Sequence, residues 1–223
     1  MTGRGLKGAP ASGGRFFTFE GGEGSGKTTQ LAALRAVLQA EGRPVVETQD
    51  PGGTAIGREI RRLLLDPASR GMAPVAELFL YEASRAQLVA EVIRPAMAQG
   101  AIVLCDRFTD STVAYQGYGR GLDLTLIVRL NAAAAGGLCP DRTFLLDLDP
   151  AAGLARVQER PQDRMEAERL SFHQRVREGY RAVAAAEPAR MVLLDAAMSA
   201  ETLGERVRQE VLAVLHPAVA PPR

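Results

Sequence analysis

The sequence predicts an α/β fold in which a parallel β-sheet is covered by helices on both faces. Short unbroken apolar runs, such as AIVLC at 101–105 and TFLLDL at 143–148, have the length and composition of strands that are buried on both faces. These runs alternate along the chain with amphipathic stretches of helical periodicity. Strands that alternate with helices in this way are typical of a parallel sheet with helices packed on both sides.

The expected elements follow in chain order. A short buried strand at 16–19 precedes a helix at 27–39, which carries Leu31, Leu34 and Leu38 on one face. The long helix expected at 75–99 should be kinked or stopped near Pro95, because proline lacks the backbone N–H that a helix interior uses. We expect the other strands at 44–48, 101–105, 143–148 and 191–194, and the other helices at 55–65, 122–134, 151–158, 166–185 and 201–215.

One domain is expected, at residues 15–215 of the 223, with no internal repeat and no domain linker. Residues 1–14 are rich in Gly, Pro and Ala and show no periodicity, and residues 216–223 are rich in proline. Segments of this composition bury too little apolar surface to fold. We therefore expect a disordered leader before the domain and a flexible tail after it.

Charge and cysteine content argue against several classes of protein. The chain has 27 Lys and Arg against 26 Asp and Glu, a net charge of +1, whereas proteins that bind nucleic acid polymers usually carry a basic surplus. The two cysteines, Cys105 and Cys139, have no zinc-ligand spacing, which favours a reducing compartment. No apolar run approaches the ~20 residues of a membrane helix. We expect a cytoplasmic enzyme that uses neither a membrane nor a nucleic acid polymer.

A phosphate-binding loop is the strongest motif in the chain. Residues 21–28 read GGEGSGKT and match G-x-x-x-x-G-K-[ST], and the match follows a predicted strand and opens a predicted helix. Glycines allow successive backbone N–H groups to turn inward and form an anion site at the helix N-terminus. Lys27 can reach the β- and γ-phosphates and the Thr28 hydroxyl can ligate Mg²⁺. The motif therefore predicts a nucleoside triphosphate site.

The lysine content narrows the class of nucleotide-binding protein. Lys7 and Lys27 are the only lysines, so the N-K-x-D motif of a guanine-reading switch and the second signature lysine of partitioning ATPases are both absent. We expect no long second domain in these residues that would couple hydrolysis to mechanical work. A small-molecule kinase with its acceptor beside the loop is the favoured interpretation. A non-catalytic ATP-dependent switch that signals to a partner is the alternative from another class.

Two charged positions near the loop point to the acceptor side. Glu23 lies inside a loop built for anions, so it needs an arginine, metal-bound water or a sugar hydroxyl as a partner, unless its side chain points away into solvent. Asp106 and Arg107 follow the strand at 101–105, and ligands of open α/β sheets bind at the carboxyl ends of strands. Asp106 can hold a Mg²⁺-bound water and Arg107 can bridge two phosphates, or the two residues form a structural ion pair.

Three further segments could line an acceptor pocket. Residues 50–54 (DPGGT) form a tight turn that either contacts the acceptor or is only a turn. Tyr81 and Arg85 share one helix face, which suits a base-stacking ring beside a guanidinium but equally a core tyrosine beside a surface arginine. Gln116 carries a donor and an acceptor, which suits a base edge that offers N–H beside C=O.

An arginine-rich stretch follows the predicted helix at 151–158. Arg156, Arg160 and Arg164 flank Pro161 and suggest a mobile lid that closes over phosphates and excludes water. A solvated charged helix end is the alternative interpretation. For Asp163 and Glu166 we favour a structural role.

With these residues together, the chain resembles the bacterial thymidylate kinases over residues 15–215. The segments FEGGEGSGKTT, DPGGT, Y-x-x-x-R at Tyr81–Arg85, DRFTDSTVAYQGYGR and the lid ending in DRME carry the resemblance. It implies a three-layer P-loop kinase fold with a short Arg-rich lid at about 156–168. It further implies transfer of the γ-phosphoryl group from ATP to dTMP, giving dTDP, with Mg²⁺ as cofactor and a homodimer as the usual assembly.

The resemblance also implies roles for individual residues. Glu23 would meet the deoxyribose 3′-hydroxyl and metal waters, and Arg107 would clamp the dTMP phosphate. Tyr81 would stack on thymine, and Arg85 would donate to thymine O4. Gln116 with Thr112 would lie near N3, and Tyr115 would crowd the 2′ position. Because the loop carries no arginine, the lid would supply the catalytic one, with Arg160 the first choice, then Arg164 and Arg156.

Together these interpretations give four groups of site residues. The predicted catalytic residues are Lys27, Arg107, Arg160, Arg164 and Glu23. The predicted ATP residues are Gly21, Gly22, Glu23, Gly24, Ser25, Gly26, Lys27, Thr28, Thr29 and Arg156. The predicted dTMP residues are Asp50, Pro51, Arg61, Tyr81, Arg85, Arg107, Ser111, Thr112, Tyr115 and Gln116. The predicted metal residues are Thr28, and Asp106 and Glu23 through water.

The chain departs from the family pattern at a few positions. Gln49 and Asp50 stand where Arg-Glu is common, Tyr81 replaces the usual Phe, and Phe108 stands where Tyr or His is frequent. The added hydroxyl of Tyr81 requires a hydrogen-bond partner. The trio of Tyr81, Arg85 and Gln116 favours a 4-keto pyrimidine but does not sense the 5-methyl group, so a kinase for dUMP or for pyrimidine monophosphates more broadly remains the alternative.

Overall fold

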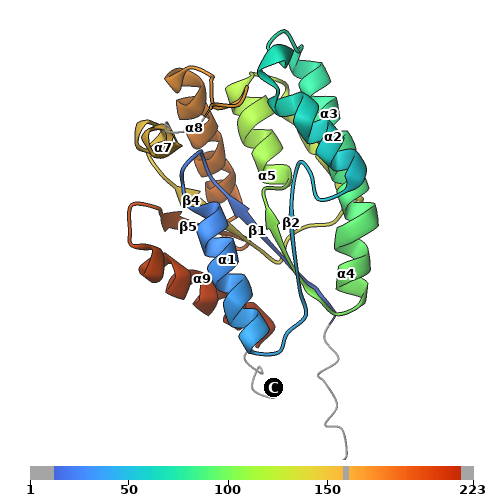
Figure 1. Ribbon diagram of the computed structural model, residues 1–223, viewed down its shortest axis with the longest axis vertical. Helices are drawn as coiled ribbons and strands as arrows, with labels where there is room; N and C mark the ends of the chain where they lie inside the picture. The colour runs from blue at the N-terminus through green and yellow to red at the C-terminus, as the bar shows by residue number, and fades with distance from the viewer. Residues whose placement is uncertain (1–12, 158–160, 217–223) are drawn as a thin grey trace, which may run out of the picture.

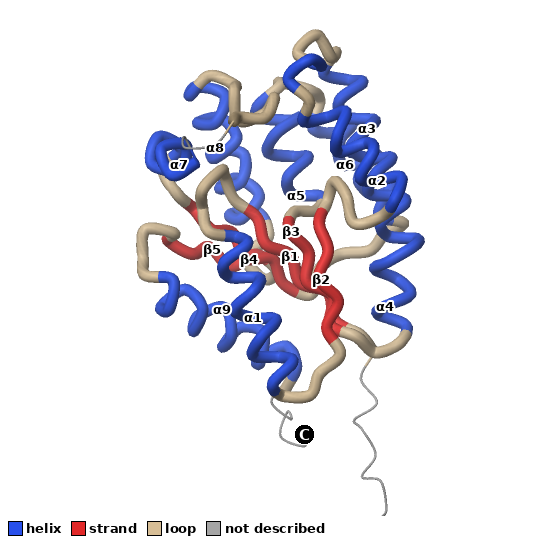
Figure 2. The backbone as a smooth tube through the Cα atoms, in the orientation of Figure 1, coloured by secondary structure: helices blue, strands red, loops and turns tan. Residues whose placement is uncertain are grey.

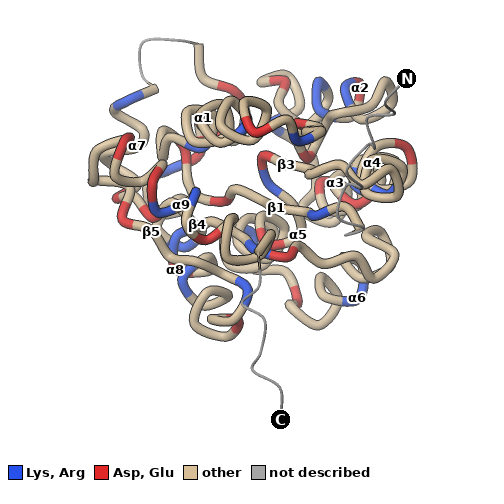
Figure 3. The backbone as a smooth tube through the Cα atoms, turned by 90° about the horizontal axis from the view of Figure 1, so that it is seen from below, with Lys and Arg blue, Asp and Glu red and all other residues tan. Residues whose placement is uncertain are grey.

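The computed structural model describes residues 13–157 and 161–216. Arg160, almost all of the predicted leader and residues 217–223 of the predicted tail therefore lie outside the described residues. Within them, no helix is long and apolar enough to cross a membrane. Acidic and basic positions are scattered around the molecule and do not separate onto two sides (Figure 3).

A parallel sheet forms the centre of the molecule (Figure 2). In the described part of the chain it has five strands in the order β2-β3-β1-β4-β5, and every neighbouring pair is parallel. The predicted α/β fold class is therefore confirmed. The strands are β1 (Arg15–Glu20), β2 (Val45–Gln49), β3 (Ile102–Asp106), β4 (Arg142–Asp147) and β5 (Met191–Asp195).

Helices cover both faces of this sheet (Figure 1). One face packs against α1 (Lys27–Ala40) and α9 (Ala200–Leu215), and the other packs against residues of α3 (Pro74–Leu88), α4 (Arg94–Ala98), α6 (Leu124–Ala135) and α8 (Leu170–Ala186). Helix α2 (Ala55–Leu65) packs on α3, and α7 (Pro150–Val157) packs on α8. Shorter pieces are the 3₁₀ turn η1 (Pro67–Ser69), α5 (Thr109–Thr112) and the π-helical segments η2 (Val89–Ile93) and η3 (Val113–Gly119).

The alternation of side chains along the strands divides the core into two layers. On β1, Phe17 and Phe19 point into the cluster with α1 and α9, whereas Phe16 points into the cluster with η2 and α4. On β4, Phe144 joins the first layer and Leu145 packs against α8 on the opposite face. Because both faces are covered, successive strand residues are buried, which explains the unbroken apolar runs in the sequence.

The helical elements agree with one expectation and differ from two others. The helical path expected at 75–99 is interrupted by η2 just before Pro95, as expected near that proline, which then lies in the first turn of α4, where a missing N–H is tolerated. The helix expected from 166 begins only at Leu170, because the Asp163 carboxylate accepts from the N–H groups of Met165 and Glu166 and closes a turn there. The helical segment at 109–119 was not expected, because hydroxyl residues and glycines have low helix propensity.

We expect Leu104→Ala to lower the free energy of unfolding by about 2–5 kcal/mol, because the substitution empties a space in the fully buried centre of β3. Urea denaturation measures the change. The matched control is Leu193→Ala on the edge strand β5, where the side chain is 50% exposed and the expected loss is under about 1 kcal/mol. Equal losses for the two variants would contradict the described core.

Candidate active site

The phosphate-binding loop joins β1 to α1. Gly24 (φ 64°) and Gly26 (φ 93°) adopt left-handed backbone conformations, which let the loop turn its N–H groups inward ahead of α1. The Lys27 ammonium donates to the carbonyl oxygens of Gly21 at 3.2 Å and Gly22 at 3.0 Å. Burial, with the nearby positive charge of Arg107, lowers the pKa of Lys27. The loop lines an open cleft of about 1320 Å³, which includes residues 23–29, Asp106 and Arg156.

Helix α7 approaches this loop through two glycines. A Cβ atom on Gly24 would lie 2.3 Å from the carbonyl oxygen of Gly153, and one on Gly153 would lie 2.2 Å from the carbonyl oxygen of Glu23. Only residues without a side chain fit at these two positions. The contact holds the start of α7 on the loop, and Arg156 on that helix donates to the Gly24 carbonyl oxygen at 3.1 Å.

Glu23 pairs with an arginine and does not point away into solvent. Its carboxylate accepts from Arg107 at 2.9 Å and from the Tyr115 hydroxyl at 2.9 Å. Burial alone would raise the pKa of Glu23, but the charges of Arg107 and Lys27 and the Tyr115 hydrogen bond outweigh it and lower the pKa to about 2. Glu23 is therefore an anion in the middle of a cationic site at any physiological pH.

Arg107 is held in an unfavourable backbone conformation. It follows β3 with φ 69°, in the left-handed region that only glycine adopts readily, and strain of this kind gathers at functional sites. Its N–H bonds to the Phe19 carbonyl oxygen, and its guanidinium donates to the Gly21 carbonyl oxygen and the Tyr180 hydroxyl, each at 2.9 Å. These contacts aim the side chain across the end of β1 towards the phosphate-binding loop.

Glu20, the last residue of β1, fixes neighbours of Arg107 through hydrogen bonds. Its two oxygens accept from the Phe108 N–H at 2.7 Å, the Ser111 hydroxyl at 2.6 Å and the Tyr180 hydroxyl at 2.8 Å. Burial and the negative charge of Asp110 raise the pKa of Glu20 to about 7, although Arg107 opposes the shift. Glu20 therefore links β1 to the segment after β3 and to α8.

A second cavity adjoins the phosphate-loop cleft. Both hollows are lined by Glu23, Arg61 and Arg107, so they form one continuous site. All ten predicted dTMP residues line the second cavity: Asp50, Pro51, Arg61, Tyr81, Arg85, Arg107, Ser111, Thr112, Tyr115 and Gln116, together with Glu23, Leu65, Asp163 and Met165. Three strand ends, a turn and α3 thus converge on one place.

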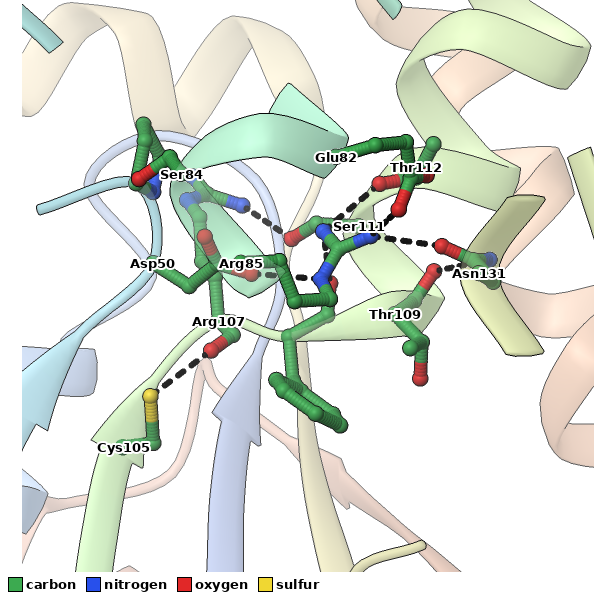
Figure 4. A network of polar contacts seen from close by, with 12 residues as sticks. Asp50, Glu82, Ser84, Arg85, Cys105, Arg107, Thr109, Ser111, Thr112 and Asn131 are labelled. Atoms are coloured by element: carbon green, nitrogen blue, oxygen red, sulfur yellow. Dashed lines mark hydrogen bonds and ion pairs between the residues drawn. The ribbon is translucent and has the colours of Figure 1, made fainter. Parts of the chain in front are cut away.

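Arg85 is buried in the wall of this cavity, not exposed on the surface of α3 (Figure 4). Its Nε donates to Asp50 at 2.6 Å, and one terminal nitrogen donates to Glu82 at 2.9 Å and Asn131 at 2.6 Å. The other terminal nitrogen donates to Thr112 at 2.8 Å and to the Phe108 carbonyl oxygen at 3.3 Å. All five N–H groups are therefore engaged. Asp50, although shorter than the usual Glu, still reaches the guanidinium.

The two tyrosines of the cavity differ in how they are fixed. Tyr115 is held by Glu23, and the Arg107 guanidinium lies 5.0 Å from its ring centroid. Burial and the negative charge of Glu77 raise the pKa of Tyr81. Among the described residues the Tyr81 hydroxyl has no hydrogen-bond partner, so the extra polar group expected to need one is open to a ligand or to water.

The lid arginines lie in different environments. Arg164 is buried, with one terminal nitrogen 2.6 Å from Glu77 and its Nε 2.6 Å from the Leu64 carbonyl oxygen, so it fixes the C-terminal part of the predicted lid to α2 and α3. Arg156 lies at the loop, as described above. Arg160, the first choice for the catalytic arginine, lies outside the described residues. Asp163 closes the turn before α8, in line with the structural role favoured for it.

Asp106 and Thr28 suit a magnesium ion held together with phosphates. The two residues line the same cleft, and the Asp106 Oδ1 atom is buried without a hydrogen-bond partner. Among the described residues no group of three or more His, Cys, Asp or Glu is placed to hold a metal. Mg²⁺ is commonly bound by one or two protein oxygens, with waters and substrate phosphates completing its shell. The residues present therefore fit that cofactor.

Sequence reasoning missed three residues that build the site. Glu20 carries a signal that could have been used, since it is a charge at the end of an otherwise apolar buried strand. Tyr180 and Glu77 carry none, because each lies on a long helix among ordinary helix residues. Their roles depend on which elements pack together, and one sequence does not reveal that.

Glu20→Gln should flatten the pH dependence of stability. In the native wild type Glu20 keeps its proton up to about pH 7, whereas in the unfolded chain it loses it near the ordinary value of 4.5. Between about pH 5 and pH 8 the unfolded chain therefore binds fewer protons at Glu20 than the folded chain does. As pH rises through this range, the free energy of unfolding of the wild type should fall, on the order of 1–3 kcal/mol. Urea denaturation of both proteins at pH 5 and pH 8 measures it. Parallel pH profiles would show that Glu20 titrates normally.

Comparison with known proteins agrees with this geometry. The family model for thymidylate kinase matches residues 19–207. The thymidylate kinase of Solidesulfovibrio magneticus is 59% identical over 200 residues, which cover 86% of this chain and 96% of that protein. That of Gloeobacter violaceus is 57% identical over 199 residues, covering 88% of this chain and 93% of that protein.

A solved structure matches as well. The crystal structure of thymidylate kinase from Ehrlichia chaffeensis superposes with a TM-score of 0.73 at 33% identity, and the match covers 90% of this chain and all of that one. The likeness therefore extends over the whole described domain and not over the phosphate-binding loop alone. On the family match, the two relatives and the shared fold, the chain belongs to the thymidylate kinase family.

Proposed function

We propose that this chain transfers the γ-phosphoryl group of ATP to dTMP, giving dTDP. The observation that carries the proposal is that the phosphate-loop cleft and the second cavity share Glu23, Arg61 and Arg107. A donor phosphate bound by the loop and an acceptor phosphate bound in the cavity would meet at the Arg107 guanidinium. Two polyanions held end to end in this way satisfy the main requirement of phosphoryl transfer, which is positioning with neutralised charge.

Different cationic side chains would bind the phosphates of the two substrates. Lys27 would leave the loop carbonyl oxygens and neutralise the β- and γ-phosphates, and Arg107 would bind the acceptor phosphate. No general base is required, because a phosphate oxygen of dTMP is already nucleophilic. Thr28 and Asp106 would hold Mg²⁺, directly and through water, and the ion when bound supplies charge neutralisation between the β- and γ-phosphates.

Glu23 would act on both sides of the shared wall. As an anion with a pKa of about 2, it can accept a hydrogen bond from the deoxyribose 3′-hydroxyl and from a metal-bound water without changing its protonation state. The same carboxylate holds Tyr115 in place, and a fixed ring at that position would crowd a 2′-hydroxyl. Preference for a deoxyribonucleotide would therefore depend on the Glu23–Tyr115 hydrogen bond.

Base recognition would come from three sides of the cavity. Tyr81 would stack on thymine and Gln116 with Thr112 would lie near N3. The N–H groups of Arg85 are all engaged, so O4 would share the donor with the longest contact, the one 3.3 Å from the Phe108 carbonyl oxygen. Cytosine carries an amino group at position 4, so a hydrogen-bond donor of the base would face an N–H donor of Arg85 and no hydrogen bond could form.

The exposed apolar residues of α3 and α6 suit the homodimer that we propose for the assembly. Val75 and Phe79 on α3 and Val128 on α6 are 42%, 54% and 59% exposed, and the two helices pack side by side. Apolar side chains gathered on neighbouring helices are typical of an interaction surface. We also propose a cytoplasmic location, because both cysteines are free, one of them on the surface.

The activity is tested by ADP release, with a coupled assay over a panel of monophosphates that includes dTMP, dUMP, dCMP and TMP with ribose. We expect dTMP to give the highest kcat/KM. Lys27→Ala should lower kcat by ~10³ or more, because the charge on the transferred phosphate is no longer neutralised. Lys7→Ala, at the only other lysine, serves as the control. Release of ADP that does not respond to any monophosphate would favour the alternative of a non-catalytic switch.

Kinetic and stability measurements distinguish the roles of the three lid arginines. Arg160→Ala should lower kcat by ~10³ or more with a normal unfolding temperature, as expected for an arginine that acts on the transition state. Arg164→Ala should instead lower stability, because Glu77 is left buried without one of its cations. Single-turnover kinetics and thermal denaturation of both variants, with Arg156→Ala beside them, make the comparison. A mild effect of all three on kcat would remove the lid from catalysis.

A further inference from the structure

Glu77 is a buried carboxylate on α3 that no role in phosphoryl transfer explains. Its side chain is fully inaccessible to solvent, and in the described residues it lines neither of the two cavities. One oxygen accepts from the Gln116 amide at 2.9 Å and from Arg120 at 3.1 Å. The other accepts from Arg120 at 3.1 Å and pairs with Arg164 at 2.6 Å. Four donors therefore converge on one carboxylate.

These contacts keep Glu77 ionised. Burial would raise the pKa of Glu77, but the hydrogen bonds and charges of Arg120, Gln116 and Arg164 outweigh it and lower the pKa. An ionised carboxylate has acceptor sites only. The group of Gln116 that faces Glu77 must then be the amide NH₂, and the reverse orientation would place the amide oxygen against a buried negative charge.

The opposite end of the Gln116 amide is the part that remains available. In the described part of the chain its carbonyl oxygen has no hydrogen-bond partner, and Gln116 lines the acceptor cavity beside Tyr81 and Thr112. A fixed carbonyl oxygen in this position accepts a hydrogen bond and cannot offer one. Thymine and uracil carry N–H at N3, whereas N3 of cytosine is an acceptor.

We propose that Glu77 is a positioning residue for base selection, which locks the Gln116 amide with its oxygen towards the base and thereby favours pyrimidines with a protonated N3. The proposal rests on the proposed function, since it assigns the base side of the same cavity. Selection of the base is then enforced by a carboxylate that does not touch the substrate. Arg120 and Arg164 contribute by holding that carboxylate charged and in place.

Glu77→Gln tests the proposal because the new amide can either accept from Gln116 or donate to it. The Gln116 amide is then free to rotate and to offer its NH₂ to N3 of cytosine. We expect the ratio of kcat/KM for dTMP to that for dCMP to fall by ~10-fold or more, about the effect of exchanging one mismatched hydrogen bond for a matched one. KM for dTMP should rise, while KM for ATP should stay within ~2-fold, since Glu77 does not line the phosphate-loop cleft.

Two further variants separate this role from a general loss of structure. Glu168→Gln removes another carboxylate that binds Arg120, at 2.5 Å, without touching Gln116, and should leave the dTMP/dCMP ratio unchanged. In a Gln116→Ala background, Glu77→Gln should no longer change that ratio, because the two residues act as one unit. If Glu77→Gln alone does not fold, the double variant Glu77→Gln with Arg164→Met is used in the same assays. The second substitution removes the buried Arg164 cation, which would otherwise lack the negative charge of its partner.

The possible results lead to different conclusions. A ratio that stays at the wild-type value in folded Glu77→Gln overturns the proposal, as does an equal change in Glu168→Gln or an undiminished change in the Gln116→Ala background. A wild-type protein that does not distinguish dTMP from dCMP overturns it too. A wild-type protein that phosphorylates neither nucleotide contradicts the proposed function itself and removes the inference with it.

Discussion

The ion pair between Glu23 and Arg107 is the constraint on which the site depends. Each residue alone would be unfavourable. Glu23 is an anion inside a loop that binds anions, and Arg107 has a left-handed backbone conformation. Together they neutralise each other, and they join the loop after β1 to the loop after β3. The pairing of strands β1 and β3, with Phe19 opposite Asp106, holds Glu23 and Arg107 close together, because each residue follows the end of one of these strands. The wall between the two cavities is therefore built by strand pairing.

The sequence predicted the strands and long helices well because burial on both faces leaves a clear signal. The unbroken apolar runs correspond to strands such as β3, and the spacing of Leu31, Leu34 and Leu38 corresponds to the buried face of α1. Prediction failed where tertiary contacts override local preference. Residues 113–119 are helical although two of them, Gly117 and Gly119, are poor helix formers, because the segment packs along α8.

The candidate site was predictable to the extent that parallel strands end at one edge of a sheet. Asp50 and Arg107 could be brought together by that rule alone, and the structure places both in one cavity with Tyr81. The rule says nothing of hydrogen-bond partners. From spacing, Arg85 was as easily a surface residue as a buried one, and only the fold shows that Asn131, 46 residues later, accepts one of its hydrogen bonds.

The full engagement of Arg85 has a thermodynamic consequence. A guanidinium whose donors are all satisfied before substrate arrives loses its side-chain freedom during folding, so ordering it adds no entropic cost to association. In the role proposed for Arg85, affinity for the base and rigidity of the domain would be linked through one residue. If Arg85 binds the base as proposed, substitutions that loosen its hydrogen-bond partners would lower both the stability of the domain and its affinity for the nucleotide.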